Sequence, residues 1–191
     1  MVGVRELLEQ AAAARRAGRL SEAFDLASQA VTLSRTGGQE GGADLRQALT
    51  RLAQALRDLG RPAEARLPQE EAVALFRDAG DGLSTAGALR HLGGILDDMA
   101  AHADAVPVYA EMMTLYQAAE VAPLEMANAV RALACNAEGR GDQREAVARW
   151  REALNRYAAL DAVFHGDFGL ADNPGVKEAR TRLARLQAGA V

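Results

Sequence analysis

Few side chains in this sequence have the type and spacing that catalysis or metal binding needs. The three histidines lie far apart, and no two of them have a metal-ligand spacing. Cys135 has no histidine motif beside it, so we interpret it as a buried structural thiol. Asp97 and Asp98 are adjacent carboxylates, but neighbouring residues of a helix diverge by about 100° and cannot act together on one substrate. We therefore expect no enzyme activity, no metal site and no cofactor.

Arginines and polar residues that recur at regular places indicate a different chemistry, the binding of a charged partner. Arg90 and Arg131 stand at matching positions of two similar stretches. A guanidinium carries a permanent charge and five donors, and it binds carboxylates in a bidentate manner. The pattern predicts a protein or peptide partner with an acidic segment. The candidate binding residues are Arg57, Arg90, Asp97, Asn128, Arg131 and Glu138.

The same residues have a second interpretation, in which the arginines form ion pairs inside the protein. Asp97 follows Arg90 by seven residues, on the same helical stripe. Glu138 stands in the same relation to Arg131, and an acid on one helix can also reach an arginine on the next. The wider candidate set mixes six arginines with four acids, which is too balanced for strong steering of a partner. That set is Arg5, Arg15, Arg16, Arg57, Arg90, Arg131, Asp58, Asp97, Asp98 and Glu138.

A repeated structure must position these residues, because the chain has an internal period of about 41 residues. One place in the period is occupied by Gly18, Gly60, Ala100 and Gly141. Five residues after each of these comes an alanine, at Ala23, Ala65, Ala105 and Ala146. Glycine at a turn often marks a backbone conformation with positive φ. We expect Ala100 to occupy the same kind of turn.

Each period contains the pattern of two amphipathic helices. From Leu89 onward, apolar residues recur at i, i+3, i+4 and i+7, which is one face of a helix. A second pattern of this kind runs over 105–116, and Met99–His102 is a short unpatterned break between the two. Gly93 is small enough to let the two helices pack closely. The stretch therefore predicts a helix, a tight turn and a second helix.

A leucine–glycine pair in the first helix, a small residue at the turn, and an alanine and an aromatic in the second helix resemble the tetratricopeptide repeat (TPR). The long period, and Pro107 two residues after Ala105, resemble the repeats of kinesin light chains. The resemblance covers residues 4–160 and implies an all-α fold, a right-handed superhelical solenoid whose first helices line a concave groove. Its four hairpins are expected at about 4–35, 42–80, 82–119 and 123–160.

The repeat pattern stops before the end of the chain. Residues 161–172 show no periodicity, and we predict a loop there. Asn173 and Pro174 are an N-cap and a first-turn signal for a final helix over 173–188. A solenoid exposes the apolar flank of its last repeat unless something covers it. We expect this helix to be that cover, and residues 1–191 to form a single domain.

The composition favours helices and argues against several kinds of partner. Hydrophobic residues make up 49% of the chain but aromatic residues only 4%, so the core must be built from small and aliphatic side chains, which suits closely packed helices. The formal net charge of −4 argues against nucleic-acid binding. No apolar stretch approaches the length of a membrane span, and no secretory signal is recognisable. We expect a cytoplasmic protein, and its arginine-rich, lysine-poor composition fits a GC-rich, bacterial-like genome.

Two functions of different class remain open at this point. The first is a non-enzymatic adaptor that binds a peptide or protein segment in the concave groove. The second is a self-associating, homodimeric module in which exposed apolar residues such as Phe164 and Phe168 dock on a neighbouring copy. The oligomeric state separates the two, because an adaptor with an open groove is expected to be a monomer. An enzyme is a distant third reading.

Overall fold

The computed structural model describes residues 2–37, 42–166 and 172–188, and every regular element in these ranges is an α-helix. The all-α prediction is confirmed. Four hairpins follow one another: α1 (Val4–Arg16) with α2 (Leu20–Thr36), α3 (Gly42–Asp58) with α4 (Pro62–Asp78), α5 (Gly82–Asp98) with α6 (His102–Gln117), and α7 (Pro123–Gly139) with α8 (Gln143–Ala158). Two further helices come after them, α9 (Asp161–Gly166) and α10 (Pro174–Ala188).

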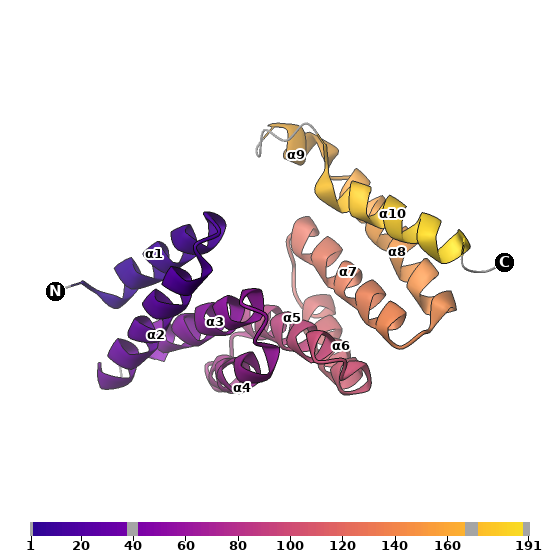
Figure 1. Cartoon of the computed structure of the whole chain (residues 1–191). Coiled ribbons are helices and arrows are strands. Elements are labelled where there is room, and N and C mark those ends of the chain that lie inside the picture. The colour runs from indigo at the N-terminus through magenta and orange to yellow at the C-terminus, as the bar shows by residue number, and fades with distance from the viewer. Residues whose placement is uncertain (1, 38–41, 167–171, 189–191) are drawn as a thin grey trace.

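The hairpins stack along a curved path (Figure 1). Each first helix contacts the first helix of the next hairpin, so that α1, α3, α5 and α7 form a continuous inner row. The second helices lie on the outer side and approach one another less closely. A stack whose inner members are closer together than its outer members must curve toward the inner side. The chain is therefore a helical solenoid with its first helices on the concave side.

Small residues at one place in each second helix allow the two helices of a hairpin to pack closely. The four alanines that mark the period are almost completely buried: Ala23, Ala65, Ala105 and Ala146. The larger side chains fill the space beside them, and Trp150 and Tyr157 are buried in one cluster with Val176 and Leu183 of α10. Each alanine removes little apolar area from water, so stability depends on the contacts between neighbouring hairpins as much as on those within them.

The turn inside each hairpin has the same left-handed backbone. The φ angles are 74° at Gly18, 72° at Gly60, 59° at Ala100 and 73° at Gly141. The prediction that Ala100 shares the glycine turn is confirmed. Because a Cβ is penalised in this region, Ala100 holds a conformation that glycine would adopt more readily.

The segment after the fourth hairpin differs from its prediction. We expected a loop over 161–172, but Asp161–Gly166 is the short helix α9, and residues 167–171 lie outside the described residues. Six residues are too few for an amphipathic pattern to be recognised, so no periodic signal marks this helix. The final helix has its expected start, because Oδ1 of Asn173 accepts hydrogen bonds from the backbone N–H groups of Gly175 (3.1 Å) and Val176 (3.3 Å). It packs on α8 and covers the last hairpin.

Replacing Ala100 by glycine should leave the free energy of unfolding unchanged, or raise it by up to about 1 kcal/mol, because the left-handed strain is relieved while unfolded-state entropy increases. Urea unfolding measures the change. Ala110→Gly, at an exposed position inside α6, is the matched control and should lose about 1 kcal/mol. An equal loss in both variants would contradict the interpretation of the turn.

Two glycines of α5 should respond in opposite ways to the addition of a methyl group. A Cβ at Gly93 would overlap the ring of Tyr109, whereas a Cβ at Gly87 would meet no atom within 4 Å. We expect Gly87→Ala to raise the free energy of unfolding by about 0.5–1 kcal/mol through helix propensity. Gly93→Ala should lower it by about 1–3 kcal/mol, because the two helices would be forced apart. A gain in both variants would show that the close contact at Gly93 is not needed.

Candidate functional site

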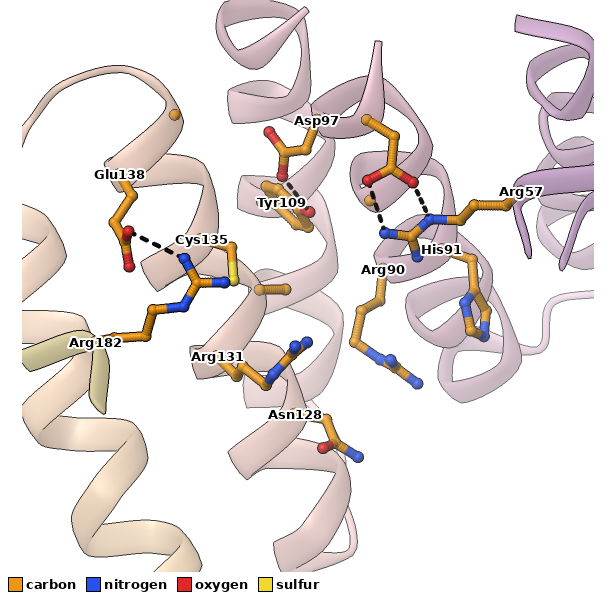
Figure 2. Close-up of a pocket in the computed structure, with 14 residues that line it drawn as sticks. Arg57, Arg90, His91, Asp97, Tyr109, Asn128, Arg131, Cys135, Glu138 and Arg182 are labelled. Carbon is orange, nitrogen blue, oxygen red and sulfur yellow. Dashed lines mark hydrogen bonds and ion pairs between the residues drawn. The ribbon is translucent and has the colours of Figure 1, made fainter. Parts of the chain in front are cut away.

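All six candidate binding residues line one cavity on the concave side of the solenoid. Its volume is about 540 Å³, and its walls come from α3, α5, α6, α7 and α10. Figure 2 shows Arg57 entering from one side and Arg182 of α10 from the other, with Arg131 between them. The six residues that the periodic pattern selected therefore lie together in space. The predicted six are Arg57, Arg90, Asp97, Asn128, Arg131 and Glu138.

Arg57 is held by an acid of the following hairpin. Its guanidinium donates two hydrogen bonds to the carboxylate of Asp98, the Nη2 bond being 3.2 Å long. These bonds raise the pKa of Arg57. Arg15 and Asp58 make the same kind of pair one repeat earlier. An arginine in the last turn of one first helix thus pairs with an aspartate at the end of the next, and this pairing ties α1, α3 and α5 together along the groove.

Arg90 and Arg131 also pair inside the protein. Nη2 of Arg90 donates to Glu125 of α7 at 3.1 Å. Nε and Nη2 of Arg131 donate to the two carboxylate oxygens of Glu178 in α10, at 2.6 and 2.9 Å, and these bonds raise the pKa of Arg131. Arg90 is therefore paired with an acid of the next first helix, and Arg131 with an acid of the final helix. The acids seven residues downstream, Asp97 and Glu138, are not their partners.

Asp97 is a structural carboxylate that joins three helices. It accepts hydrogen bonds from the Tyr109 hydroxyl (2.8 Å), Nδ2 of Asn136 (2.6 Å) and Nδ1 of His102 (2.9 Å). Its side chain is only 13% exposed. Burial, followed by the charge of Asp97, raises the pKa of Tyr109, so the phenol remains a proton donor at neutral pH. The network fixes α7 against the preceding hairpin.

Glu138 and Asn128 connect the cavity to α8 and α10. Glu138 is 11% exposed and accepts hydrogen bonds from the indole of Trp150 and from the guanidinium groups of Arg182 and Arg185. Oδ1 of Asn128 accepts from the Tyr157 hydroxyl at 2.7 Å. The final helix is therefore both a cover for the last hairpin and one wall of the cavity.

Two further cavities continue along the first helices. One of about 530 Å³ lies between α1 and α3, and one of about 330 Å³ lies between α3 and α5. Gln47 and Arg51 line both of these, and His91 lines the second of them and also the cavity of the six candidates. The three cavities therefore adjoin one another along the first helices, and together we call them the inner groove. It runs from α1 to α10.

Arg51 and His91 were not among the residues predicted from the sequence. When the repeats are aligned on Arg90 and Arg131, Arg51 and His91 stand one residue after the matching position. They match each other at one period, which is the signal that would have found them. Nε2 of His91 lies 3.1 Å from Nε2 of Gln54. Burial, followed by the charges of Arg90 and Arg57, lowers the pKa of His91 to about 3, so the imidazole is neutral at physiological pH.

The described residues contain no sign of a metal centre. No three His, Cys, Asp or Glu side chains in that part of the chain are placed to hold a metal ion. Cys135 is half-buried in the wall of the groove, and burial raises the pKa of its thiol, which is therefore protonated at neutral pH. A search of the same residues also found no helix with the length and apolar character needed to cross a membrane.

Comparison with known proteins identifies the repeat. Residues 45–79 match the tetratricopeptide repeat family. A kinesin light chain protein with nearly identical TPR-like repeats, from Podosopora anserina, has a similar structure: 19% identity, 98% of this chain and 87% of that chain covered, and a TM-score of 0.75. The apo form of RapI is 13% identical, with 98% of this chain and 70% of that chain covered and a TM-score of 0.74. BtubC from P. vanneervenii is 17% identical, with 98% of this chain and 80% of that chain covered and a TM-score of 0.67. No curated protein sequence matches the chain.

The fold defines a solenoid of the TPR class. The profile match falls on the second hairpin, α3 and α4, and the structural similarity extends over nearly the whole chain. Within that class, the TPR-like repeats of the Podosopora anserina protein have the same fold over 98% of this chain. At these levels of identity the similarity concerns the fold, and the chemistry of the inner groove depends on the residues of this chain.

The two adjacent aspartates of α5 should differ sharply in their effect on stability. Asp97→Asn leaves an amide with one acceptor oxygen among three donors, and we expect a loss of about 1–3 kcal/mol in the free energy of unfolding. Asp98→Asn removes one ion pair between half-exposed side chains and should cost at most about 1 kcal/mol. Urea unfolding at neutral pH compares the two, and equal losses would show that the Asp97 network does not hold the hairpins together.

Proposed function

We propose that this protein is a non-enzymatic adaptor that binds an extended or helical segment of a partner protein in the inner groove. The observation that carries the proposal is a row of three adjoining cavities along the first helices. The cavities at its N-terminal end share Gln47 and Arg51, and His91 belongs both to the middle cavity and to that of the six candidates. Neighbouring helix axes are about 8–10 Å apart, so the row from α1 to α10 is about 30–40 Å long. An extended segment of about 10–12 residues would span it.

The lining of the groove fits a polar, acidic segment. Guanidinium groups line all three cavities, on a chain whose formal net charge is −4. Arginine donors suit carboxylate side chains and backbone carbonyl groups alike. Local positive charge on a protein of opposite overall sign favours binding of an acidic segment at this face.

The groove residues that could take part in catalysis are either engaged in hydrogen bonds within the protein or in an unreactive protonation state. Asp97 accepts three hydrogen bonds. His91 has a pKa of about 3, far from that of an effective general base at neutral pH, and the Cys135 thiol has a raised pKa and is a poor nucleophile. This arrangement supports a binding role rather than an enzymatic one.

Self-association, the alternative function, needs a different surface from the one that we expected. Phe164 is 8% exposed and packs in the core beside α8 and α10, so it does not present a docking surface. Phe168 lies outside the described residues. The feature that favours a second copy is an apolar hollow of about 590 Å³ between α1 and α2 of the first hairpin, which Val2, Leu7 and Leu33 help to line.

A substitution that fills the inner groove without disturbing the core tests the adaptor proposal. Gly87 lines the middle cavity, and a Cβ there meets no atom, so the larger side chain of Gly87→Leu should enter the groove while the helix remains stable. Peptides of about 12 residues are selected from a random display library with the unmodified protein. Their affinity for Gly87→Leu, measured by fluorescence anisotropy, should fall at least about tenfold, because the leucine occupies the binding path.

Ala110→Leu, on the outer helix α6, adds a leucine at an exposed position and should leave the affinity unchanged. Equal binding by Gly87→Leu and the unmodified protein would place the peptides outside the inner groove. Selection of no peptide at all would contradict peptide binding. A mass of two chains that persists on dilution, measured by light scattering, would favour self-association instead.

A further inference from the structure

The arginines of the inner groove fall into two groups. The first group donates to carboxylates of other helices, so its charges are already compensated. It comprises Arg57, Arg90 and Arg131, whose partners lie in α5, α7 and α10. Arg16 and Arg51 belong to the second group. Neither of them forms an ion pair in the part of the chain that the structure describes. Their charges are therefore available to a ligand.

Arg51 is a half-buried guanidinium with most of its donors unused by the protein. Its one hydrogen bond within the described residues runs from Nη1 to Oε1 of Gln54, at 3.2 Å. A guanidinium has five N–H donors. Burial lowers the pKa of Arg51, and the positive charges of Arg15 and Arg16 lower it further. An anion bound beside Arg51 would relieve both effects.

The position of Arg51 makes it accessible from two sides. It lines the cavity between α1 and α3 and also the cavity between α3 and α5, so it lies where the two meet. Arg16 lines the first of these cavities and is exposed. The guanidinium of Arg46, on the same helix, makes a cation–π contact instead, with its Cζ atom 5.5 Å from the centre of the Phe76 ring.

The other charged groups of the first cavity leave it with an excess of positive charge. Arg5 and Asp44 form an ion pair of 3.7 Å and compensate each other. Glu9 is the remaining acid of the lining, facing the two arginines Arg16 and Arg51. One negative charge opposite two positive ones leaves a site that suits a singly charged carboxylate better than a doubly charged phosphate.

We infer that Arg51 and Arg16, in the lining of the cavity between α1 and α3, form the subsite in which the inner groove holds a carboxylate side chain of the partner segment. The inference rests on the proposed function and specifies its chemistry. It also reverses the expectation from the sequence, in which Arg90 and Arg131 grip the acidic group. Those two arginines would have to release Glu125 and Glu178 before they could do so.

Two labelled peptides of about 12 residues test the subsite, one alternating alanine with glutamate and the other alanine with glutamine. The unmodified protein should bind the glutamate peptide at least about tenfold more tightly, because charge-assisted hydrogen bonds are the stronger ones. Arg51→Gln should abolish this preference. Arg144→Gln is the matched control, since Arg144 is exposed on α8, forms no ion pair within the described residues and lines none of the three cavities.

Stability separates a binding role of Arg51 from a structural one. Arg51 gives up no ion pair when it is replaced, so Arg51→Gln should keep or raise the melting temperature. A peptide in which phosphoserine replaces glutamate should bind less tightly than the glutamate peptide; tighter binding would overturn the assignment to a carboxylate. An equal effect of Arg51→Gln and Arg144→Gln, or failure of the unmodified protein to bind the glutamate peptide, would also overturn it.

The same assay distinguishes the inference from the proposed function. If Gly87→Leu weakens the binding of both peptides while Arg51→Gln changes neither, the groove binds peptides and the carboxylate subsite is wrong. If Gly87→Leu changes the affinity for neither peptide, the proposed function itself fails, whatever the effect of Arg51→Gln.

Discussion

The structure depends on the sharing of core between neighbouring hairpins. The apolar clusters cross the boundaries between repeats: Leu7 and Leu8 of α1 pack with Leu49 of α3, and Val73 of α4 packs with Leu89 of α5. A hairpin whose faces are built largely from alanine buries too little apolar area to be stable alone. Stacking is therefore a condition of folding, and the concave surface is its geometric result.

Ion pairs also join neighbouring hairpins, on the polar side of the first helices. Arg15 with Asp58, and Arg57 with Asp98, repeat one contact along the inner row. Each of these half-exposed pairs contributes little by itself. They matter to the groove because they fix where the guanidinium groups of Arg15 and Arg57 lie, whereas Arg51 has no carboxylate partner among the described residues. The charge of the inner groove therefore depends on which of its arginines have a carboxylate partner within the protein.

Much of this organisation was predictable from the sequence because it repeats. The left-handed turn at Ala100 followed from glycines one period away, and six polar residues chosen by register line one cavity. The ion-pair partners Glu125 and Glu178 did not follow, since their distances along the chain from Arg90 and Arg131 depart from the period. The same holds for α9, which is too short to show a pattern. Periodicity predicts what every repeat does, whereas partner choice depends on the connection between two particular helices.

The place of α10 at the groove gives the last hairpin's cover a thermodynamic role. Arg182 of this helix lines the cavity of the six candidate residues, and Glu138 of α7 accepts a hydrogen bond from it. Whenever α10 detaches, that end of the groove loses a wall. The apparent affinity there is therefore the intrinsic affinity multiplied by the fraction of molecules in which the helix is docked. By mass action, a segment bound across α7 and α10 would in turn hold the helix in place. Occupancy of the groove and protection of the carboxyl-terminal helix from local unfolding are thus two measures of one equilibrium.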